Sequence, residues 1–513
     1  MNYADLFRAT LPETVLEIAA LIVLIVDLAF LRKSAQQMRT TVAALIGVAG
    51  CGAAMWAVSS FGRGFDFEGV PLLAWGGYVP AAQLGILALT ALTLLLLVGS
   101  VFTRNAGEFV TVVLMSAAGG LIISAAQDLI VIFIGLELLS LGLYVLTAFS
   151  KKSGRSAEAA IKYYLFGGMS AAFLLFGFSY LYGLTGSTNL QQVFRGLYTV
   201  NANHSAPLLY AAVVMIAAGL GFKVAAMPFH LWAPDTYEGA PAPAAAFIAS
   251  ISKVASFALL IGIGTAAWHL FDGPHFKSYV TVQITAGATP PVFLGFRAAW
   301  METLAVLSAG SIILGNLAAL AQSSVRRLLA YSAIAHTGYI LLALAFFSYS
   351  SVSANAVLYY VLTYGLTTIG AFALVDVVER ATGSDRMDSF RGLHKRNPAL
   401  AAVLLVLFLS LAGIPPLVGF WAKFDLFAAV LGVSAGPVPF TLVALAVGFS
   451  AVSLYYYLQV LKRAYVIPGV DESPIRAHPV TMTVLMLIAA AVVVLGIFPS
   501  LLVNWIASFY PAI

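Results

Sequence analysis

Long apolar stretches recur along the 513 residues of this chain, and short polar segments separate them. A helix needs about 20 apolar residues to cross a bilayer, so runs of that length indicate transmembrane helices. No polar stretch is long enough for a separate soluble domain. The pattern therefore predicts an all-α integral membrane protein with about 14 transmembrane helices, near residues 11–31, 40–60, 80–102, 106–126, 128–149, 157–184, 205–226, 243–270, 301–322, 327–348, 353–379, 399–430, 440–463 and 478–505.

Prolines interrupt two of these spans. They are Pro228 in the seventh span and Pro415 and Pro416 in the twelfth. Because proline has no N–H group, it leaves the carbonyl four residues earlier without its helical hydrogen bond. The carbonyls concerned belong to Val224, Leu411 and Ala412. At membrane depth such groups need water or a side-chain donor, so each break predicts a local polar site; a kink that only shapes packing is the alternative.

Positions in the two halves of the chain correspond at a constant offset of 196, which takes Gly119 to Gly315 and Gly142 to Gly338. The two breaks also fall at matching places. Each unit holds five spans, and an odd number forces the copies into opposite orientations, an arrangement typical of transporters with a site near the membrane midplane. The predicted organisation is an N-terminal three-helix segment at 1–105, a first inverted repeat at 106–270 (spans four to eight), a loop insertion at 271–300, a second inverted repeat at 301–464 (spans nine to thirteen) and a C-terminal span at 465–513.

Composition agrees with this picture, since 61% of residues are hydrophobic, 9% are charged and the mean hydropathy is +0.97. Most loop lysines and arginines follow odd-numbered spans. The N-terminus and the loops after even-numbered spans hold fewer: Arg8, Arg63, Arg195, Lys277 and Arg297. Because cytoplasmic loops are enriched in Lys and Arg, both termini are predicted on the periplasmic side of a bacterial inner membrane.

Four lysines lie inside apolar spans: Lys162, Lys223, Lys253 and Lys423. A lysine charge at the bilayer centre costs about 2.5–3.5 kcal/mol on insertion scales, and such residues typically mark ion or proton paths. Each lysine is therefore expected to be neutral, paired or beside water. The alternatives are snorkelling of Lys162, Lys223 or Lys423 to an interface and a polar helix-packing patch around Lys253.

Glu137 is the carboxylate in the middle of the fifth span. Burial favours the neutral form of an amine, whereas a nearby carboxylate favours the charged form. A lysine beside Glu137 could therefore accept and release protons as Glu137 moves closer or further away. A purely structural ion pair is the alternative.

Other titratable side chains have two interpretations each. His336 in the tenth span could relay protons between the halves or be a satisfied core histidine. His230, followed by Asp235 and Glu238 just past the first break, could feed protons inward or cap the broken helix. Asp425 is either a partner of the lysine two residues before it or points away, because that spacing on a helix does not favour contact.

Missing motifs exclude other chemistry. The single cysteine, Cys51, excludes an intrachain disulfide and a four-cysteine iron–sulfur cluster. No glycine-rich nucleotide loop and no convincing histidine pair for haem occur. Energy for transport must therefore come from an ion gradient or a partner.

Several motifs resemble the antiporter-like membrane subunits of respiratory complex I. They are PFHLWAPD at 228–235, YEGAP at 237–241, RLLAYS at 327–332 with His336, and GIPP at 413–416 with Gly419, Phe420 and Lys423. The resemblance covers spans four to thirteen. It implies a proton path through Glu137, Lys223, Lys253 and Lys423, with Lys162 and His336 between them.

The resemblance also separates members of the family. The largest member has a long lateral C-terminal helix, whereas this chain stops after the fourteenth span, and the middle member typically has Glu where this chain has Lys423. Both differences favour the subunit N family, whose nearest relatives outside the complex are Mrp-type cation/proton antiporter subunits.

This family implies a proton-translocating NADH:quinone oxidoreductase in which this chain carries out no redox chemistry. NAD, FMN, iron–sulfur clusters and quinone are expected on other subunits, and neighbouring membrane subunits and the lipid bilayer are the expected partners. No nucleic acid and no metal in this chain are expected.

Overall fold

The computed structural model describes residues 3–61, 65–67, 70–100, 102–199, 202–268, 292–347, 351–433, 436–469 and 473–510. Its helices in the first half are α1 (Tyr3–Ala9), α2 (Leu11–Ile25), the π-helical turn η1 (Val26–Phe30), α3 (Gln36–Phe61), α4 (Tyr78–Leu95), α5 (Ala106–Ala125), α6 (Leu129–Thr147), α7 (Gly154–Thr185), α8 (Leu190–Thr199), α9 (Ala202–Val224), α10 (Trp232–Gly239) and α11 (Ala242–Trp268). Those in the second half are α13 (Val292–Leu320), α14 (Val325–Ala345), α15 (Ser351–Thr382), the 3-10 turn η2 (Met387–Phe390), α16 (Leu393–Arg396), α17 (Pro398–Ala412), α18 (Val418–Val433), α19 (Pro437–Tyr465), α20 (Pro479–Ile497) and α21 (Ser500–Ala507).

The predicted fold class is confirmed. In the described ranges, 12 helices are individually long and apolar enough to cross a membrane. The other two predicted spans are divided: the first is α2 followed by η1, and the twelfth is α17 followed by α18. The chain is therefore a multi-pass membrane protein.

Two short elements depart from the sequence prediction. Strands β1 (Phe65–Phe67) and β2 (Val70–Leu73) form an antiparallel pair, and α8 is a short helix between α7 and α9. These elements are shorter than an apolar run that crosses a membrane, so the hydrophobic pattern does not indicate them. Of the predicted insertion at 271–300, residues 271–291 lie outside the described residues, and α13 begins at Val292, nine residues before the predicted 301.

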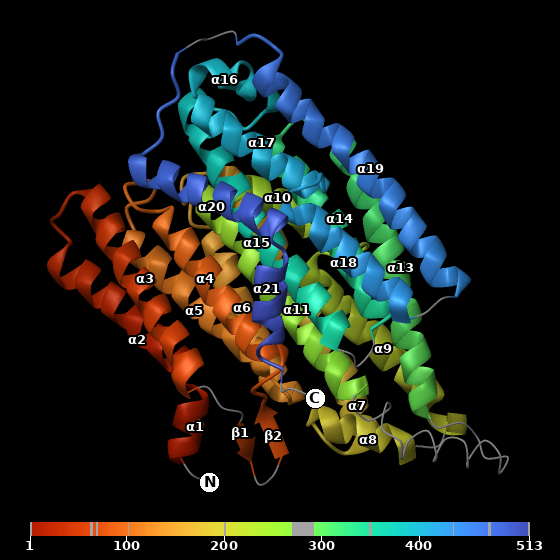
Figure 1. The fold of residues 1–513 in the computed structure, drawn as a ribbon. Helices are drawn as coiled ribbons and strands as arrows, with labels where there is room; N and C mark the ends of the chain where they lie inside the picture. The colour runs from red at the N-terminus through yellow and green to blue at the C-terminus, as the bar shows by residue number, and fades with distance from the viewer. Residues whose placement is uncertain are drawn as a thin grey trace.

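Both chain ends, the β1–β2 pair and α8 lie at one end of the helix bundle (Figure 1). Helix α16 and the loop leading to α20 lie at the other end, here called the basic end because it carries Lys395, Arg396 and Arg476. The apolar stretch of α11 is 100% buried and that of α14 is 94% buried, whereas that of α19 is 22% buried. Helices α11 and α14 therefore form the interior of the bundle.

Local sequence explains where several helices begin and end. Asp128 accepts hydrogen bonds from the backbone N–H groups at the start of α6, and Ser324 does so at the start of α14. Such caps satisfy N–H groups that have no partner within the helix. Gly413 ends α17 in the left-handed conformation, at φ +86°, where a side chain would be strained.

Close helix crossings recur at the predicted offset of 196. A Cβ atom on Gly119 would lie 2.6 Å from the backbone nitrogen of Leu139, and one on Gly315 would lie 2.6 Å from that of Ala335. The two glycines lie 196 positions apart in the sequence, and so do the residues that they would contact, Leu139 and Ala335. The division into two inverted repeats stays a prediction, and these matched crossings support it.

These crossings predict that Gly315→Ala destabilises the protein. The new methyl group would meet backbone atoms that cannot move aside, and overpacking of this kind typically costs about 1–3 kcal/mol. The midpoint of thermal unfolding of the protein purified from membranes should fall. Gly448→Ala in α19 is the matched control, because no atom lies within 4 Å of the added carbon. Equal midpoints for the two variants would contradict the close crossing.

Candidate functional site

Side-chain donors satisfy the carbonyls that the two helix breaks release. At the first break, the Thr337 hydroxyl donates to the Val224 carbonyl at 2.7 Å. At the second break, the Lys423 amine donates to the Leu411 carbonyl at 3.2 Å and to the Ala412 carbonyl at 2.9 Å. The prediction that these carbonyls need donors is therefore confirmed. Each break also contains a cis peptide bond, at Met227-Pro228 and at Pro415-Pro416.

Lys223, near the end of α9, is 8% exposed and faces α6. Its Nζ atom lies 2.5 Å from the Ser140 hydroxyl and 3.6 Å from Oε1 of Glu137. The distance to Glu137 is longer than a normal N–H···O hydrogen bond of about 2.7–3.2 Å. The carboxylate is close enough for an ion pair, but the hydroxyl is the nearer partner.

Lys253, in the interior helix α11, is 2% exposed. Its amine donates to the Ala333 carbonyl at 2.6 Å and to the Thr337 hydroxyl at 2.7 Å. Within the described part of the chain, no carboxylate forms an ion pair with it. Because Thr337 also donates to Val224, one hydroxyl connects Lys253 to the break beside Lys223.

Aromatic rings connect Lys253 to His336 on α14. The Lys253 amine lies 5.7 Å from the centre of the Tyr364 ring, and that ring lies 4.8 Å from the His336 ring. The His336 Nδ1 atom is 2.7 Å from the Tyr360 hydroxyl. His336 is 5% exposed, and the rings of Tyr339, Tyr360 and Tyr364 surround it.

Lys423, at 6% exposure, completes this row of buried groups. Its amine lies 5.4 Å from the centre of the Tyr339 ring, which lies 5.8 Å from the His336 ring. A cavity of about 10 Å³ between His336, Leu411 and Gly419 is about large enough for one water molecule.

Two small residues shape the Lys423 site. The amine also donates to the Ser450 hydroxyl at 2.8 Å, and a Cβ atom on Gly413 would lie 3.1 Å from it. Glycine at 413 thus serves both the left-handed turn and the close approach of the amine. Among the described residues, Asp425 is not an ion-pair partner of Lys423, which agrees with its unfavourable spacing.

Lys162 differs from the other three lysines. Its side chain is 41% exposed, and its amine lies 2.7 Å from both Glu158 and Asp235. Arg327 lies 2.8 Å from Asp235 and 2.9 Å from Glu238 and so extends this surface network. The structure therefore places Lys162 in an ion-pair network at the edge of the bundle rather than beside Lys223.

The same network sets the pKa of Asp235. Burial alone would raise the pKa of Asp235, but hydrogen bonds from Lys162 and Arg327 outweigh burial and hold the pKa below its usual value. His230, on the turn before α10, is 6% exposed, and its Nδ1 atom has no hydrogen-bond partner in the part of the chain described. His230 therefore lies near the network without joining it through this atom.

Sequence reasoning missed Thr337, Tyr339 and Tyr364 as members of the site. Their hydroxyl groups inside apolar helices were an available signal, because buried polar side chains require partners. The described residues include no group of three or more metal-binding side chains.

Comparisons with known proteins match this geometry. Residues 126–288 and 278–450 match the family described as "NADH:quinone oxidoreductase/Mrp antiporter, TM". The chain is 44% identical to NADH-quinone oxidoreductase subunit N 2 of Acidobacterium capsulatum, over 99% of both chains. It is also similar to a chain of respiratory complex I from Thermus thermophilus with bound aureothin, at 31% identity and TM-score 0.74, over 96% of this chain and 98% of that one.

A chain of the Mrp complex from Dietzia sp. has the same fold, with TM-score 0.73 over 97% of this chain and 96% of that one, at 19% identity. Fold, breaks and buried amines together define an antiporter-like multi-pass membrane protein. Within that class, the chain belongs to the NADH-quinone oxidoreductase subunit N family, which confirms the resemblance seen in the motifs.

The contacts of Thr337 predict that Thr337→Val destabilises the protein. Valine keeps the shape but leaves the buried Val224 carbonyl without a donor, which typically costs about 1–3 kcal/mol. Thermal unfolding should therefore occur at a lower temperature, and Thr337→Ser, which keeps the hydroxyl, should unfold close to the unmodified protein. If valine and serine variants unfold alike, the hydroxyl does not satisfy the break.

The Asp235 network predicts a pH-dependent stability. The pKa of Asp235 in the folded protein lies below its unfolded value, about 3.9, so its contribution is fully present above that pH and is lost as pH falls through the folded pKa. Asp235→Asn should lower the unfolding temperature at neutral pH, and the difference should shrink below about pH 4. Asp5→Asn is the control, because Asp5 lies 3.9 Å from Arg8 on the exposed surface. A difference independent of pH would contradict the ionic origin.

Proposed function

We propose that this chain is a proton-translocating membrane subunit of an NADH-quinone oxidoreductase, in which electron transfer from NADH to quinone on other subunits drives proton movement. Its membership of the subunit N family supports this assignment. The observation that carries the proposal is the row of buried amines: Lys223, Lys253 and Lys423 are at most 8% exposed, and two of them contact groups at the helix breaks.

The first buried step of the proposed path is at Glu137 and Lys223. An amine 3.6 Å from a carboxylate is stabilised in its charged form, and movement of Glu137 away would favour release of the proton. Lys253 and Lys423 have neutral hydroxyl and carbonyl partners, which accept hydrogen bonds from an ammonium without fixing its charge. A proton released at one amine can thus be taken up at the next.

His336 is proposed to relay the proton between Lys253 and Lys423. Its ring lies between Tyr364 and Tyr339, each of which contacts one of the two amines. A neutral imidazole accepts a proton on one nitrogen and releases one from the other. The small cavity beside Leu411 would let one water bridge His336 to the Lys423 break.

Lys162 belongs to the proposed path as part of its uptake end. Its ion pairs with Asp235 and Glu158 lie at the bundle edge, where protons from water reach carboxylates readily. His230, Glu238 and Asp425 are proposed to support uptake or release.

The proposal includes location and partners. We propose that the basic end faces the cytoplasm of a bacterial inner membrane and that both termini face the periplasm. The neighbours would be other membrane subunits of the complex, and NAD, FMN, iron–sulfur clusters and quinone would be bound elsewhere in the assembly. An Mrp-type cation/proton antiporter subunit is the alternative; the higher identity to the complex I chain than to the Mrp chain, 31% against 19%, favours the first function.

The proposal predicts that Lys253→Met and Lys423→Met each lower NADH-driven proton pumping in inverted membrane vesicles. Methionine preserves the length of the apolar stem but cannot carry a proton. A step that loses 1.4 kcal/mol of stabilisation slows about tenfold, so we expect at least this loss in transfer through the chain. Pumping would be followed with a pH-sensitive dye while NADH oxidation is recorded.

Lys462→Met is the matched control, because Lys462 lies exposed near the end of α19. The amount of assembled complex must be equal in all three variants. Full pumping with normal NADH oxidation in the Lys253 and Lys423 variants would refute the proposed path. Copurification without any iron–sulfur subunit would favour the antiporter alternative.

A further inference from the structure

A buried hydrogen-bond network anchors the Tyr339 ring and joins three helices. Its members are Asn316 on α13, Tyr339 on α14 and Tyr456 on α19, and each is at most 1% exposed. The Asn316 amide donates to the Tyr339 hydroxyl at 3.1 Å, and the Tyr456 hydroxyl donates to the Asn316 amide oxygen at 3.1 Å. Neither Asn316 nor Tyr456 belongs to the proposed proton path.

Three hydrogen bonds fix the orientation of the Asn316 amide. Its nitrogen also donates to the Ile312 carbonyl at 2.8 Å. A backbone carbonyl can only accept, so the NH₂ group faces Ile312 and Tyr339, and the amide oxygen is left to accept from Tyr456. Both N–H groups and the oxygen thus have partners. Because a fully satisfied buried network is rigid, the amide holds the Tyr339 hydroxyl in one place.

The position of the Tyr339 ring affects the charge of Lys423. The Lys423 amine lies over the ring, 5.4 Å from its centre, and a cation within about 6 Å of a ring centre is attracted to the ring face. The same ring stands nearly perpendicular to the His336 ring, at 83°. This attraction acts on the charged amine, so the ring stabilises Lys423 when it carries a proton.

Helix packing alone does not require this network. At the offset of 196, the corresponding positions in the first half are Gly120 and Leu143, which have no polar side chain. The helix crossing at Gly119 is nevertheless as close as the crossing at Gly315. Burying an amide costs free energy that its hydrogen bonds must offset. The network therefore indicates a role in the site beside it.

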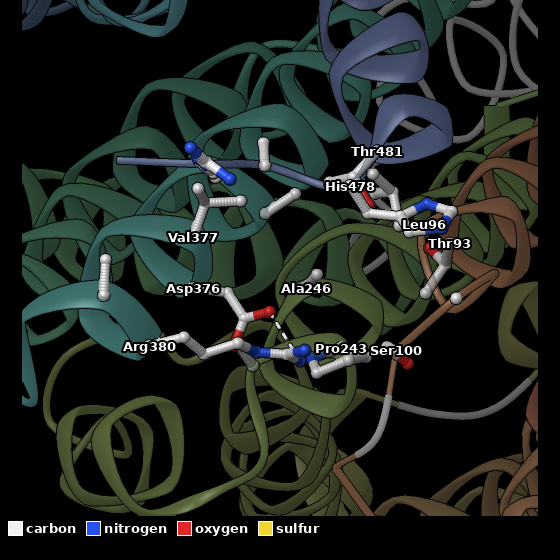
Figure 2. Close-up of a pocket in the computed structure, with 16 residues that line it drawn as sticks. Thr93, Leu96, Ser100, Pro243, Ala246, Asp376, Val377, Arg380, His478 and Thr481 are labelled. Atoms are coloured by element: carbon white, nitrogen blue, oxygen red, sulfur yellow. Dashed lines mark ion pairs between the residues drawn. The ribbon is translucent and has the colours of Figure 1, made fainter. Parts of the chain in front are cut away.

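The network is closed to water. None of its three members lines the cavity of about 270 Å³ at the basic end, where Figure 2 shows the ion pair between Asp376 and Arg380. None of them lines the small cavity beside His336 either. A route for protons from water would need members that water can reach. The network thus holds a side chain in place and does not itself conduct protons.

We propose that Asn316, held by Tyr456, is a positioning residue that keeps the Tyr339 ring over the Lys423 amine and so favours loading of Lys423 with a proton. This inference rests on the proposed function, in which Lys423 takes up and releases a proton. Without the amide, the Tyr339 hydroxyl loses its anchor and the ring can turn away from the amine. The charged amine then loses its cation–π partner, so the effect falls on the proton-loaded state.

The test uses infrared difference spectroscopy during NADH oxidation, on the assembled complex with ring-deuterated tyrosine. We expect a label-sensitive tyrosine band in the unmodified complex, because the charge over the Tyr339 ring changes. This band should be missing in Tyr339→Phe and should shift in Asn316→Leu. Tyr455→Phe is the matched control, because Tyr455 is 59% exposed on α19, and it should leave the band unchanged.

Proton pumping driven by NADH gives a second readout. Asn316→Leu and Tyr339→Phe should each lower pumping about fivefold, which corresponds to about 1 kcal/mol of cation–π stabilisation. The double variant should lose no more than either single variant, because both changes release the same ring. Losses that multiply in the double variant, or an unchanged tyrosine band in Asn316→Leu, would overturn the proposal.

Thermal unfolding and the amount of assembled complex show whether each variant has folded. If Asn316→Leu does not assemble, Tyr456→Phe replaces it, because this change keeps the ring and removes only the donor to the amide. Full pumping in Lys423→Met would refute the proposed function itself. Lost pumping in Lys423→Met, together with normal pumping and a normal tyrosine band in Asn316→Leu, would refute only the positioning role.

Discussion

The constraint on which this structure depends is the need to satisfy backbone carbonyls at two helix breaks inside an apolar bundle. An unsatisfied carbonyl in hydrocarbon costs several kcal/mol, so broken helices at membrane depth require donors. Thr337 supplies the donor at the first break and Lys423 at the second. At each break, the group that stabilises the fold thus belongs to the row of polar contacts that defines the site.

The two breaks solve the same problem in different ways. At the second, a lysine amine donates directly, and Gly413 leaves room for it. At the first, the lysine contacts Glu137 and Ser140, and a threonine from α14 satisfies the break. Because Thr337 also accepts from Lys253, one hydroxyl connects that amine to the first break.

Much of the fold was predictable because a bilayer fixes the length of apolar helices, and because proline positions locate the breaks. Lys223, Lys253 and Lys423 lie inside apolar stretches of membrane length, and all three are buried in the structure. For Lys162, the sequence left burial and snorkelling to an interface both open, because span length does not say which helix face meets lipid. The role of Thr337 was not predicted, because its contact with Val224 joins helices that are far apart in the sequence. The β1–β2 pair was not predicted, because its strands are short.

The central claim is that Lys423 changes its protonation while it is bound to the carbonyls of the second break. Infrared difference spectroscopy during NADH oxidation, with ¹³C at leucine carbonyls, tests this directly. The account predicts an isotope-sensitive carbonyl band in the unmodified complex that is missing in Lys423→Met, because the Leu411 carbonyl loses or regains a strong donor. Identical difference spectra for the two proteins would contradict it.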